Sequence, residues 1–458
     1  MTRKSTDEGT SKPLIDAARR GQKYLDELGS RPVFPRPENV RRLESALATD
    51  MPAGPTPADD VLAFLDDFGS PATVASAGGR YFGFVTGGAL PVTVAAHALA
   101  TAWDQNCFSF ISSPAVHLFD AAALRWLKDI FHLPAETEGA FVLGATLANF
   151  TCLAAARHEV LRRVGWNVEE QGLRGGPEVT VIVGEEAHGI IFKVLPLLGF
   201  GRAHILRAPV DDQGRIRANK LPRIKGPALV CIQAGNVNSG AFDPAEEIIE
   251  SAHAAGAWVH VDGAFGLWAL ASPKRSRLMA GFEAADSWAT DAHKWLNVPY
   301  DCGVAIVRHA TALRAAMSIS GDYLLLESRD ASGFAPDGSR RARGVDVWAA
   351  LRHLGRSGLA ELIDRHCDQA RWLADQLALA GVEVLNDVVL NQVVVAFGDD
   401  DRTMKAIAAL QKAGDCWCGG TRWQGREAMR ISISSWATTQ DDLEITFRAI
   451  LAAADRVS

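Results

Sequence analysis

The chain has 458 residues, of which 48% are hydrophobic and 22% charged, and its formal net charge is −7. This length exceeds one ordinary domain, and the composition is typical of a globular protein with a large core. The mild negative charge provides no basic surface for nucleic acid, and no uninterrupted apolar run is long enough to predict a membrane span.

Residues 1–50 are polar, and the N-terminal segment has little core of its own. An amphipathic helix is predicted over 11–28, proline-rich spacers occupy 31–37 and 51–57, and a second helix is predicted over 57–69. The start of the chain has no apolar stretch typical of a secretory signal, so we expect a cytoplasmic location. We assign residues 1–105 to an N-terminal helical segment that wraps another surface.

From residue 139 to residue 308, short apolar runs alternate with helical stretches. This alternation predicts a mostly parallel sheet with helices on both faces. Ligands of such sheets bind at the carboxyl ends of the strands. The predicted strands cover 140–143, 179–183, 203–206, 228–233, 258–261, 287–289 and 303–307, and the predicted helices cover 147–164, 189–198 and 245–255.

The turn after the first of these strands contains only small residues, Gly144, Ala145 and Thr146. Such a turn lets backbone N–H groups close around an anion at the positive end of the following helix. Small residues are common in strand-to-helix turns, so this pattern alone is weakly specific.

Two ionisable residues follow neighbouring predicted strands, Asp262 after 258–261 and Lys294 shortly after 287–289. Alone, Asp262 is typical of a turn or cap, and Lys294 is typical of a surface charge. Together they suit pyridoxal phosphate chemistry, in which a lysine holds the aldehyde as a Schiff base and a carboxylate pairs with the protonated ring nitrogen.

The segments HVDGAFG (260–266) and DAHKWLN (291–297) resemble the group II pyridoxal-phosphate-dependent amino acid decarboxylases, the family of aromatic amino acid and glutamate decarboxylases. The resemblance implies the α/β fold called PLP fold type I, with a large cofactor-binding domain (106–345) and a small α+β C-terminal domain (346–458). It also implies a homodimer with pyridoxal 5'-phosphate and no metal, which decarboxylates an L-amino acid to the amine and CO2.

The same resemblance assigns roles to individual residues. The catalytic residues it implies are Lys294, Asp262 and His188, and His188 corresponds to a histidine that stacks on the cofactor ring. Without the resemblance, His188 is typical of a helix cap or a core residue. The cofactor-binding residues it implies are Gly144, Ala145, Thr146, His188, Asn236, Asp262, Ala264, Asp291, His293 and Lys294. Asn236 departs from the family, which has threonine there.

Substrate contacts are less well determined by the sequence. The resemblance brings Phe84 and Thr86 near the substrate, and together with Trp103 and Phe110 they hint at an apolar or aromatic pocket. Arg430 in the segment MRISIS either binds a substrate carboxylate or forms a structural ion pair, and the sequence leaves both open.

The polar segment 318–345 corresponds to a loop that closes over the site in relatives. In aromatic amino acid decarboxylases this loop carries a tyrosine that donates a proton after CO2 leaves, but residues 324–345 contain no tyrosine. This difference leaves open an oxygen-using variant that forms an aldehyde. A transaminase or carbon–carbon lyase on the same scaffold is a further alternative, and so is a cofactor-binding protein without turnover, which the joint presence of Lys294 and Asp262 disfavours.

The last hundred residues predict the small domain. Helices are predicted over 345–354, 358–379, 402–413 and 440–456, and strands over 382–385, 391–397 and 428–433. The seven cysteines are scattered and odd in number, so we expect free thiols and a reducing compartment.

Overall fold

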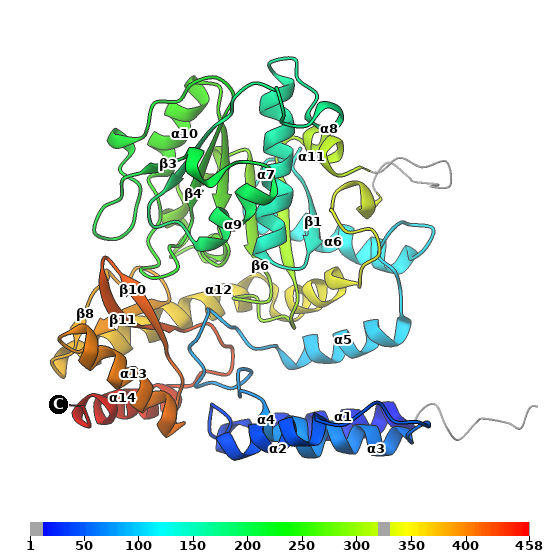
Figure 1. Ribbon diagram of the computed structural model, residues 1–458, viewed down its shortest axis with the longest axis vertical. Coiled ribbons are helices and arrows are strands. Elements are labelled where there is room, and N and C mark those ends of the chain that lie inside the picture. Colours follow the sequence, from blue (N-terminus) through cyan, green and yellow to red (C-terminus); the bar gives the residue numbers. More distant parts are fainter. Residues whose placement is uncertain (1–11, 319–329, 458) are drawn as a thin grey trace, which may run out of the picture.

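The computed structural model describes residues 12–318 and 330–457. Over these residues the chain forms a layer of N-terminal helices, a seven-stranded sheet between helices and a smaller four-stranded sheet (Figure 1). No helix in this part of the chain has both the length and the apolar character needed to cross a bilayer. The predicted fold class is confirmed.

Four helices form the N-terminal layer, which lies beside α5 (Pro91–Trp103) at the bottom of Figure 1. None of the four contains a buried residue, and Leu14, Leu47 and Val61 are among their exposed apolar side chains. The layer is tied to the small domain, for example by the backbone bond from Val33 N–H to the Gly414 carbonyl (2.8 Å). The four helices are α1 (Lys12–Asp26), α2 (Pro37–Leu47), α3 (Ala58–Phe64) and α4 (Ser70–Ala72).

The large sheet has the strand order β1-β7-β6-β5-β4-β2-β3. Strands β2, β3, β4, β5 and β6 run parallel to one another, whereas β7 is antiparallel to both β6 and β1. The carboxyl ends of β4, β5 and β6 therefore meet at one edge. The strands are β1 (Glu138–Val142), β2 (Thr180–Gly184), β3 (Ile205–Ala208), β4 (Ala228–Gln233), β5 (Trp258–Asp262), β6 (Ser287–Asp291) and β7 (Gly303–Val307).

Helices cover both faces of this sheet, and every residue of its central strands β4, β5 and β6 is therefore buried. Side chains of a strand alternate between faces, so Val230 packs in one layer and Leu229 in the other. The first layer contains α6 (Pro114–Ile130), α10 (Ala245–Ala254) and α12 (Arg343–Leu379). The second contains α7 (Ala145–Arg162), α9 (Gly189–Leu197) and α11 (Ala310–Met317), with the short α8 (Val168–Gln171) against α7.

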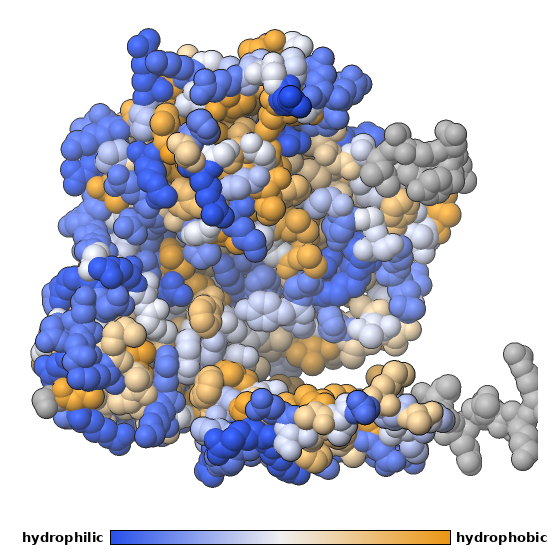
Figure 2. All heavy atoms as spheres, in the orientation of Figure 1, coloured by the Kyte–Doolittle hydropathy of each residue, from blue (hydrophilic) through white to orange (hydrophobic). Residues whose placement is uncertain are grey.

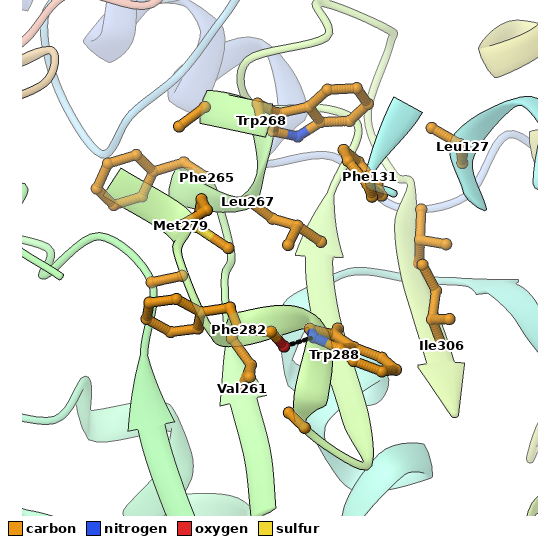
Figure 3. Close-up of a cluster of buried hydrophobic side chains, with 14 of the residues drawn as sticks. Leu127, Phe131, Val261, Phe265, Leu267, Trp268, Met279, Phe282, Trp288 and Ile306 are labelled. Carbon is orange, nitrogen blue, oxygen red and sulfur yellow. Dashed lines mark hydrogen bonds between the residues drawn. The ribbon is translucent and has the colours of Figure 1, made fainter. Parts of the chain in front are cut away.

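Large aromatic side chains fill the first layer beneath β5 and β6 (Figure 3). The rings of Phe131 and Trp268 meet edge to face with their centroids 5.0 Å apart. Trp288 of β6 is fully buried, and its indole N–H donates to the carbonyl of Phe282 at 2.8 Å. This packing fixes β6, the strand that leads into Lys294.

The small sheet is antiparallel with the order β10-β11-β9-β8. Helices α13 (Asp400–Ala413) and α14 (Gln440–Asp455) pack on one face. The opposite face is directed at the large domain, where the Thr421 hydroxyl donates to the Asn238 side chain at 2.8 Å. The strands are β8 (Glu383–Val384), β9 (Gln392–Ala396), β10 (Gly419–Trp423) and β11 (Arg426–Ser432).

Some predicted elements were wrong in detail. The strand predicted over 203–206 begins only at Ile205 (β3), because residues 203 and 204 belong to the 3-10 turn Arg202–His204. Strand β10 was missed, because its two glycines weaken the strand signal. The two helices predicted over 345–354 and 358–379 are confirmed, because the non-helical conformation of Gly355 (φ 62°) divides α12 into two helices at a kink. The domain boundaries at 105 and 345 stay a prediction.

Replacing Trp288 with alanine should lower the free energy of unfolding by about 3–5 kcal/mol, since it leaves a large cavity beneath the central strands. Urea-induced unfolding followed by circular dichroism measures this loss. Leu379→Ala is the matched control, because Leu379 is 82% exposed and its loss should change the free energy by less than about 0.5 kcal/mol. Equal unfolding midpoints for the two variants would contradict this account of the core.

Candidate active site

Asp262 is the last residue of β5, at the centre of the large sheet. Its backbone lies between Gln233 of β4 and Ala289 of β6, and its side chain is buried. Burial raises the pKa of the Asp262 carboxyl, while the charges of His188 and Lys294 lower it. A carboxylate in this position is stable as an anion only when a positive charge lies close to it.

Lys294 lies in the turn after β6, at the neighbouring strand end. Its Nζ is 3.0 Å from Oδ2 of Asp291, the last residue of β6. His293 precedes it, and Nδ1 of His293 accepts the Cys302 N–H at 3.1 Å, which leaves Nε2 to carry the proton of the neutral ring. Desolvation lowers the pKa of His293, so its ring is neutral at pH 7.

The predicted anion-binding turn lies against these residues. Gly144 precedes α7, and the N–H of Ala145 donates to Oδ1 of Asp291 at 2.6 Å. A Cβ atom on Gly144 would lie 3.2 Å from Cε1 of His293, so a side chain at this position would press on the His293 ring. Thr146 follows in the first turn of α7 and is half-buried. The turn therefore presents the positive end of α7 to the space beside Lys294.

His188 forms the N-cap of α9, and its Nδ1 accepts the N–H of Ile190 at 3.2 Å. The ring keeps an exposed part at the wall of the site, yet the surrounding protein desolvates it and lowers its pKa. Asp262 and Asp291 raise this pKa, and Lys294 and Arg430 lower it. The structure therefore brings these five predicted residues into one electrostatic neighbourhood.

Arg430 is in β11, on the face of the small sheet directed at the large domain. Burial lowers the pKa of its guanidinium, and Nη1 donates to the Val237 carbonyl at 3.4 Å. Among residues 12–318 and 330–457 it forms no ion pair, so the structural ion pair considered from the sequence is not found there. A desolvated guanidinium of this kind is suited to bind a carboxylate.

Asn236 and Ala264 support loops at the strand ends. The Asn236 amide donates to the Glu186 carbonyl at 3.1 Å, and its Oδ1 accepts the N–H groups of Asn238 and Ser239. The Ala264 carbonyl accepts the Asp291 N–H at 2.9 Å. These bonds shape the edge of the site, and a direct contact of either residue with the cofactor stays a prediction.

The predicted substrate residues precede α5 in the chain. Phe84 is 63% exposed with φ 54°, and Thr86 is buried with its hydroxyl 3.3 Å from the hydroxyl of Tyr300. The Tyr300 ring packs on His293 with centroids 4.3 Å apart, which joins Thr86 to the lysine turn. Trp103 lies elsewhere, in a small cluster with Phe119.

Asn297 is a site residue that the sequence analysis missed. Its side-chain amide donates to the carbonyls of Trp295 (2.8 Å) and Ser434 (3.0 Å), and its Oδ1 accepts the N–H of Trp436 at 2.6 Å. Its own carbonyl accepts the Leu90 N–H at 2.8 Å. With φ 58°, Asn297 adopts a left-handed conformation that asparagine tolerates, and it fixes the turn after Lys294 to two other segments.

These residues fit pyridoxal phosphate. A lysine amine, a buried carboxylate one strand away, a histidine ring at the wall and a helix N-terminus beside a glycine match the aldehyde, the ring nitrogen, the ring face and the phosphate. The absence of a side chain at Gly144 lets the backbone of this turn approach the His293 ring closely.

Comparisons with known proteins agree with this fit. Residues 44–397 match the family described as the pyridoxal-dependent decarboxylase conserved domain. An L-2,4-diaminobutyrate decarboxylase of Rhizobium meliloti (strain 1021) is 32% identical over 377 residues, which cover 77% of this chain and 73% of that protein. An aromatic-L-amino-acid decarboxylase of Bacillus atrophaeus is 29% identical over 62% of this chain and 60% of its own length.

The fold has close counterparts among solved structures. The crystal structure of Oryza sativa TDC with PLP and tryptamine superimposes with a TM-score of 0.89 and 22% identity, covering 100% of this chain and 99% of that one. At this identity the comparison supports the fold.

Replacing Arg430 with glutamine should raise the pKa of His188, because the guanidinium charge opposes protonation of the imidazole. NMR titration of protein labelled at histidine measures the change, with His188→Gln to assign the signal. Arg422→Gln is the matched control, since Arg422 is an exposed arginine of β10 paired with Glu427. An unchanged His188 titration in Arg430→Gln would show that the two groups do not interact.

Proposed function

This chain belongs to the family of pyridoxal-dependent decarboxylases, and from that premise we propose that it removes the α-carboxylate of an L-amino acid with an aromatic side chain. Its cofactor is pyridoxal 5'-phosphate, and the reaction of such decarboxylases yields an amine and CO2. The observation that carries the proposal is the buried Asp262 carboxylate at the strand end next to Lys294. The relative from Bacillus atrophaeus supports an aromatic substrate.

The cofactor-holding roles follow from the positions of the residues. Lys294 would bond to the cofactor aldehyde, Asp262 would pair with the ring nitrogen, and His188 would stack on the ring. His293 and the turn of Gly144, Ala145 and Thr146 would hold the phosphate. When bound, the cofactor supplies an electron-accepting ring for the bond that breaks at Cα.

The protein side chains determine charge and proton positions. Asp262 is ionised when it faces a cationic ring, since that charge compensates for its burial. His188 is neutral because desolvation lowers its pKa, and its Nδ1 accepts the Ile190 N–H. Its Nε2 therefore holds the ring proton and would donate a hydrogen bond to the group that lies against it in the site. Arg430 would hold the substrate carboxylate.

A homodimer is also part of this proposal. Large apolar side chains are exposed on consecutive segments of the chain, and contiguous apolar surface of this kind marks interaction sites. Figure 2 shows apolar residues along the N-terminal layer and the part of the molecule that it faces. The exposed residues of the segments around α5 and α6 are Phe84, Val94, Leu99, Ile111 and Leu118. The seven cysteines, all free thiols, support a cytoplasmic location.

Purified holoenzyme should release an amine and an equal amount of CO2 from aromatic L-amino acids when oxygen is excluded. Lys294→Ala should abolish this turnover, because no other amine holds the cofactor, and Asp262→Asn should slow it at least about 100-fold, because a neutral amide stabilises the protonated ring poorly. Lys274→Ala, at a 70% exposed lysine, is the control.

The same assay separates the alternatives. Aldehyde formed only in air would indicate an oxygen-using enzyme, and a keto acid without CO2 would indicate a transaminase. Absence of product from all twenty L-amino acids would refute the proposed function.

Sedimentation velocity should give twice the chain mass for the wild type. Leu99→Asp should shift the protein towards a monomer, because it buries a charge in the interface. Leu379→Asp, at an exposed apolar residue of the α12 C-terminus, should leave the mass unchanged. A monomeric wild type at micromolar concentration would contradict the dimer.

A further inference from the structure

The face of the small sheet that points at the large domain carries an aromatic residue that no sequence pattern singled out, Trp417. Its neighbours Cys416 and Cys418 are fully buried in the core against α13 and α14. Because side chains alternate along an extended chain, Trp417 points to the opposite face. That face also carries Arg430, whose backbone pairs with Gly419 two residues further along. The indole is half-buried rather than enclosed.

A segment from the N-terminal part of the chain extends this sheet beside Trp417. The Trp417 N–H donates to the Arg80 carbonyl (3.0 Å), and the Phe82 N–H donates to the Trp417 carbonyl (2.9 Å). The Ser432 N–H donates to the Phe82 carbonyl (3.0 Å), so residues 80–82 lie between the segment that precedes β10 and the C-terminal end of β11. Phe82 packs in the core with the two cysteines, and Tyr81 therefore shares the face of Trp417.

Three aromatic rings meet on this face. The rings of Tyr81 and Trp417 are stacked with centroids 5.0 Å apart, and the Phe84 ring is 5.5 Å from that of Trp417. Gly83 lies between them without a side chain. A Cβ atom on Gly83 would lie 2.2 Å from Cζ3 of Trp417, so the indole occupies the space that any larger residue at position 83 would need.

The same segment leads directly to the lysine turn. Thr86 contacts Tyr300, which packs on His293, as described above. A Cβ atom on Gly87 would lie 1.8 Å from the carbonyl oxygen of Lys294, so the backbone at position 87 touches the turn itself. Residues 81–87 thus form a short segment that contacts Trp417 near its start and the backbone of Lys294 at its end.

We propose that Trp417, seated over Gly83, is a specificity-determining residue that packs against the side chain of the substrate. This inference rests on the proposed function. An indole face offers a large apolar surface for a flat ring and no partner for an anionic group, so it favours aromatic over small aliphatic and acidic side chains. Arg430 on the same sheet face binds the substrate carboxylate, and Trp417 contacts the substrate side chain and discriminates between side chains of different shape.

The test compares wild type, Trp417→Phe and Trp417→Ala as holoenzymes. The ratio of kcat/KM for L-tryptophan to kcat/KM for L-leucine should fall about 10-fold in Trp417→Ala, chiefly through KM, and less in Trp417→Phe, which retains a ring. Trp166→Ala is the control, because Trp166 is also half-buried but lies beyond the end of α7. Circular dichroism and cofactor absorbance check that each variant is folded and loaded.

Gly83→Ala provides a second variant that does not remove the indole. The added Cβ displaces the Trp417 ring, so this variant should lower the same ratio in the wild-type background. In the Trp417→Ala background the space is open, and Gly83→Ala should then have no further effect. This non-additivity is expected only if the two residues act at one place.

The outcomes separate the two proposals. Equal loss of kcat/KM for every substrate in Trp417→Ala, or additive effects of the two substitutions, would overturn the role of Trp417 while leaving the decarboxylase function intact. If the wild type produces no amine, the proposed function fails. Calorimetric binding of L-tryptophan and L-leucine to the holoenzyme then tests Trp417, with weaker selectivity of Trp417→Ala supporting the role and equal selectivity refuting it.

Discussion

A carboxylate kept away from water at the end of β5 is the constraint on which the rest of the site depends. An ionised carboxylate is costly to bury unless a cation compensates for it, and here the neighbouring charges are those of Lys294 and a titratable His188. Only a central strand with both faces covered by helices can hold Asp262 in this way. The large aromatic core beneath β5 and β6 therefore serves the chemistry, because it keeps two strand ends at fixed separation.

Positioning Lys294 requires more than its own strand. Asn297 binds the carbonyl of Ser434 in the small domain and accepts the N–H of Leu90 before α5, so three distant segments meet in the turn that carries the lysine. His366 of α12 adds a fourth connection, accepting the Trp295 indole N–H at 2.8 Å. These bonds connect the small domain and the N-terminal part of the chain directly to the lysine turn.

The sequence predicted what is encoded locally. Alternating strands and helices gave the large sheet, and strand ends gave Asp262 and Lys294, because parallel strands bring their carboxyl ends to one edge. It could not predict Trp417 or Asn297, since their roles depend on segments hundreds of residues away. Strand β10 escaped notice because Gly419 and Gly420 lower its strand propensity. Whether Arg430 forms a structural ion pair also could not be predicted, because the answer depends on which side chains the tertiary structure brings close to it. Residues 319–329 of the predicted loop, which include Tyr323 just before its tyrosine-free part, lie outside the described residues.

The site divides its tasks between two sheets. The ends of β5 and β6 and the start of α7 carry the charged groups proposed to hold the cofactor, and Asp262 and Asp291 among them are buried. The face of the small sheet carries Arg430 and Trp417, which are half-buried and contact segments outside the large sheet. Residues of this second kind can change without disturbing the buried carboxylate. A decarboxylase scaffold can therefore take a new substrate by substitutions on one sheet face, while the strand ends that perform the chemistry stay the same.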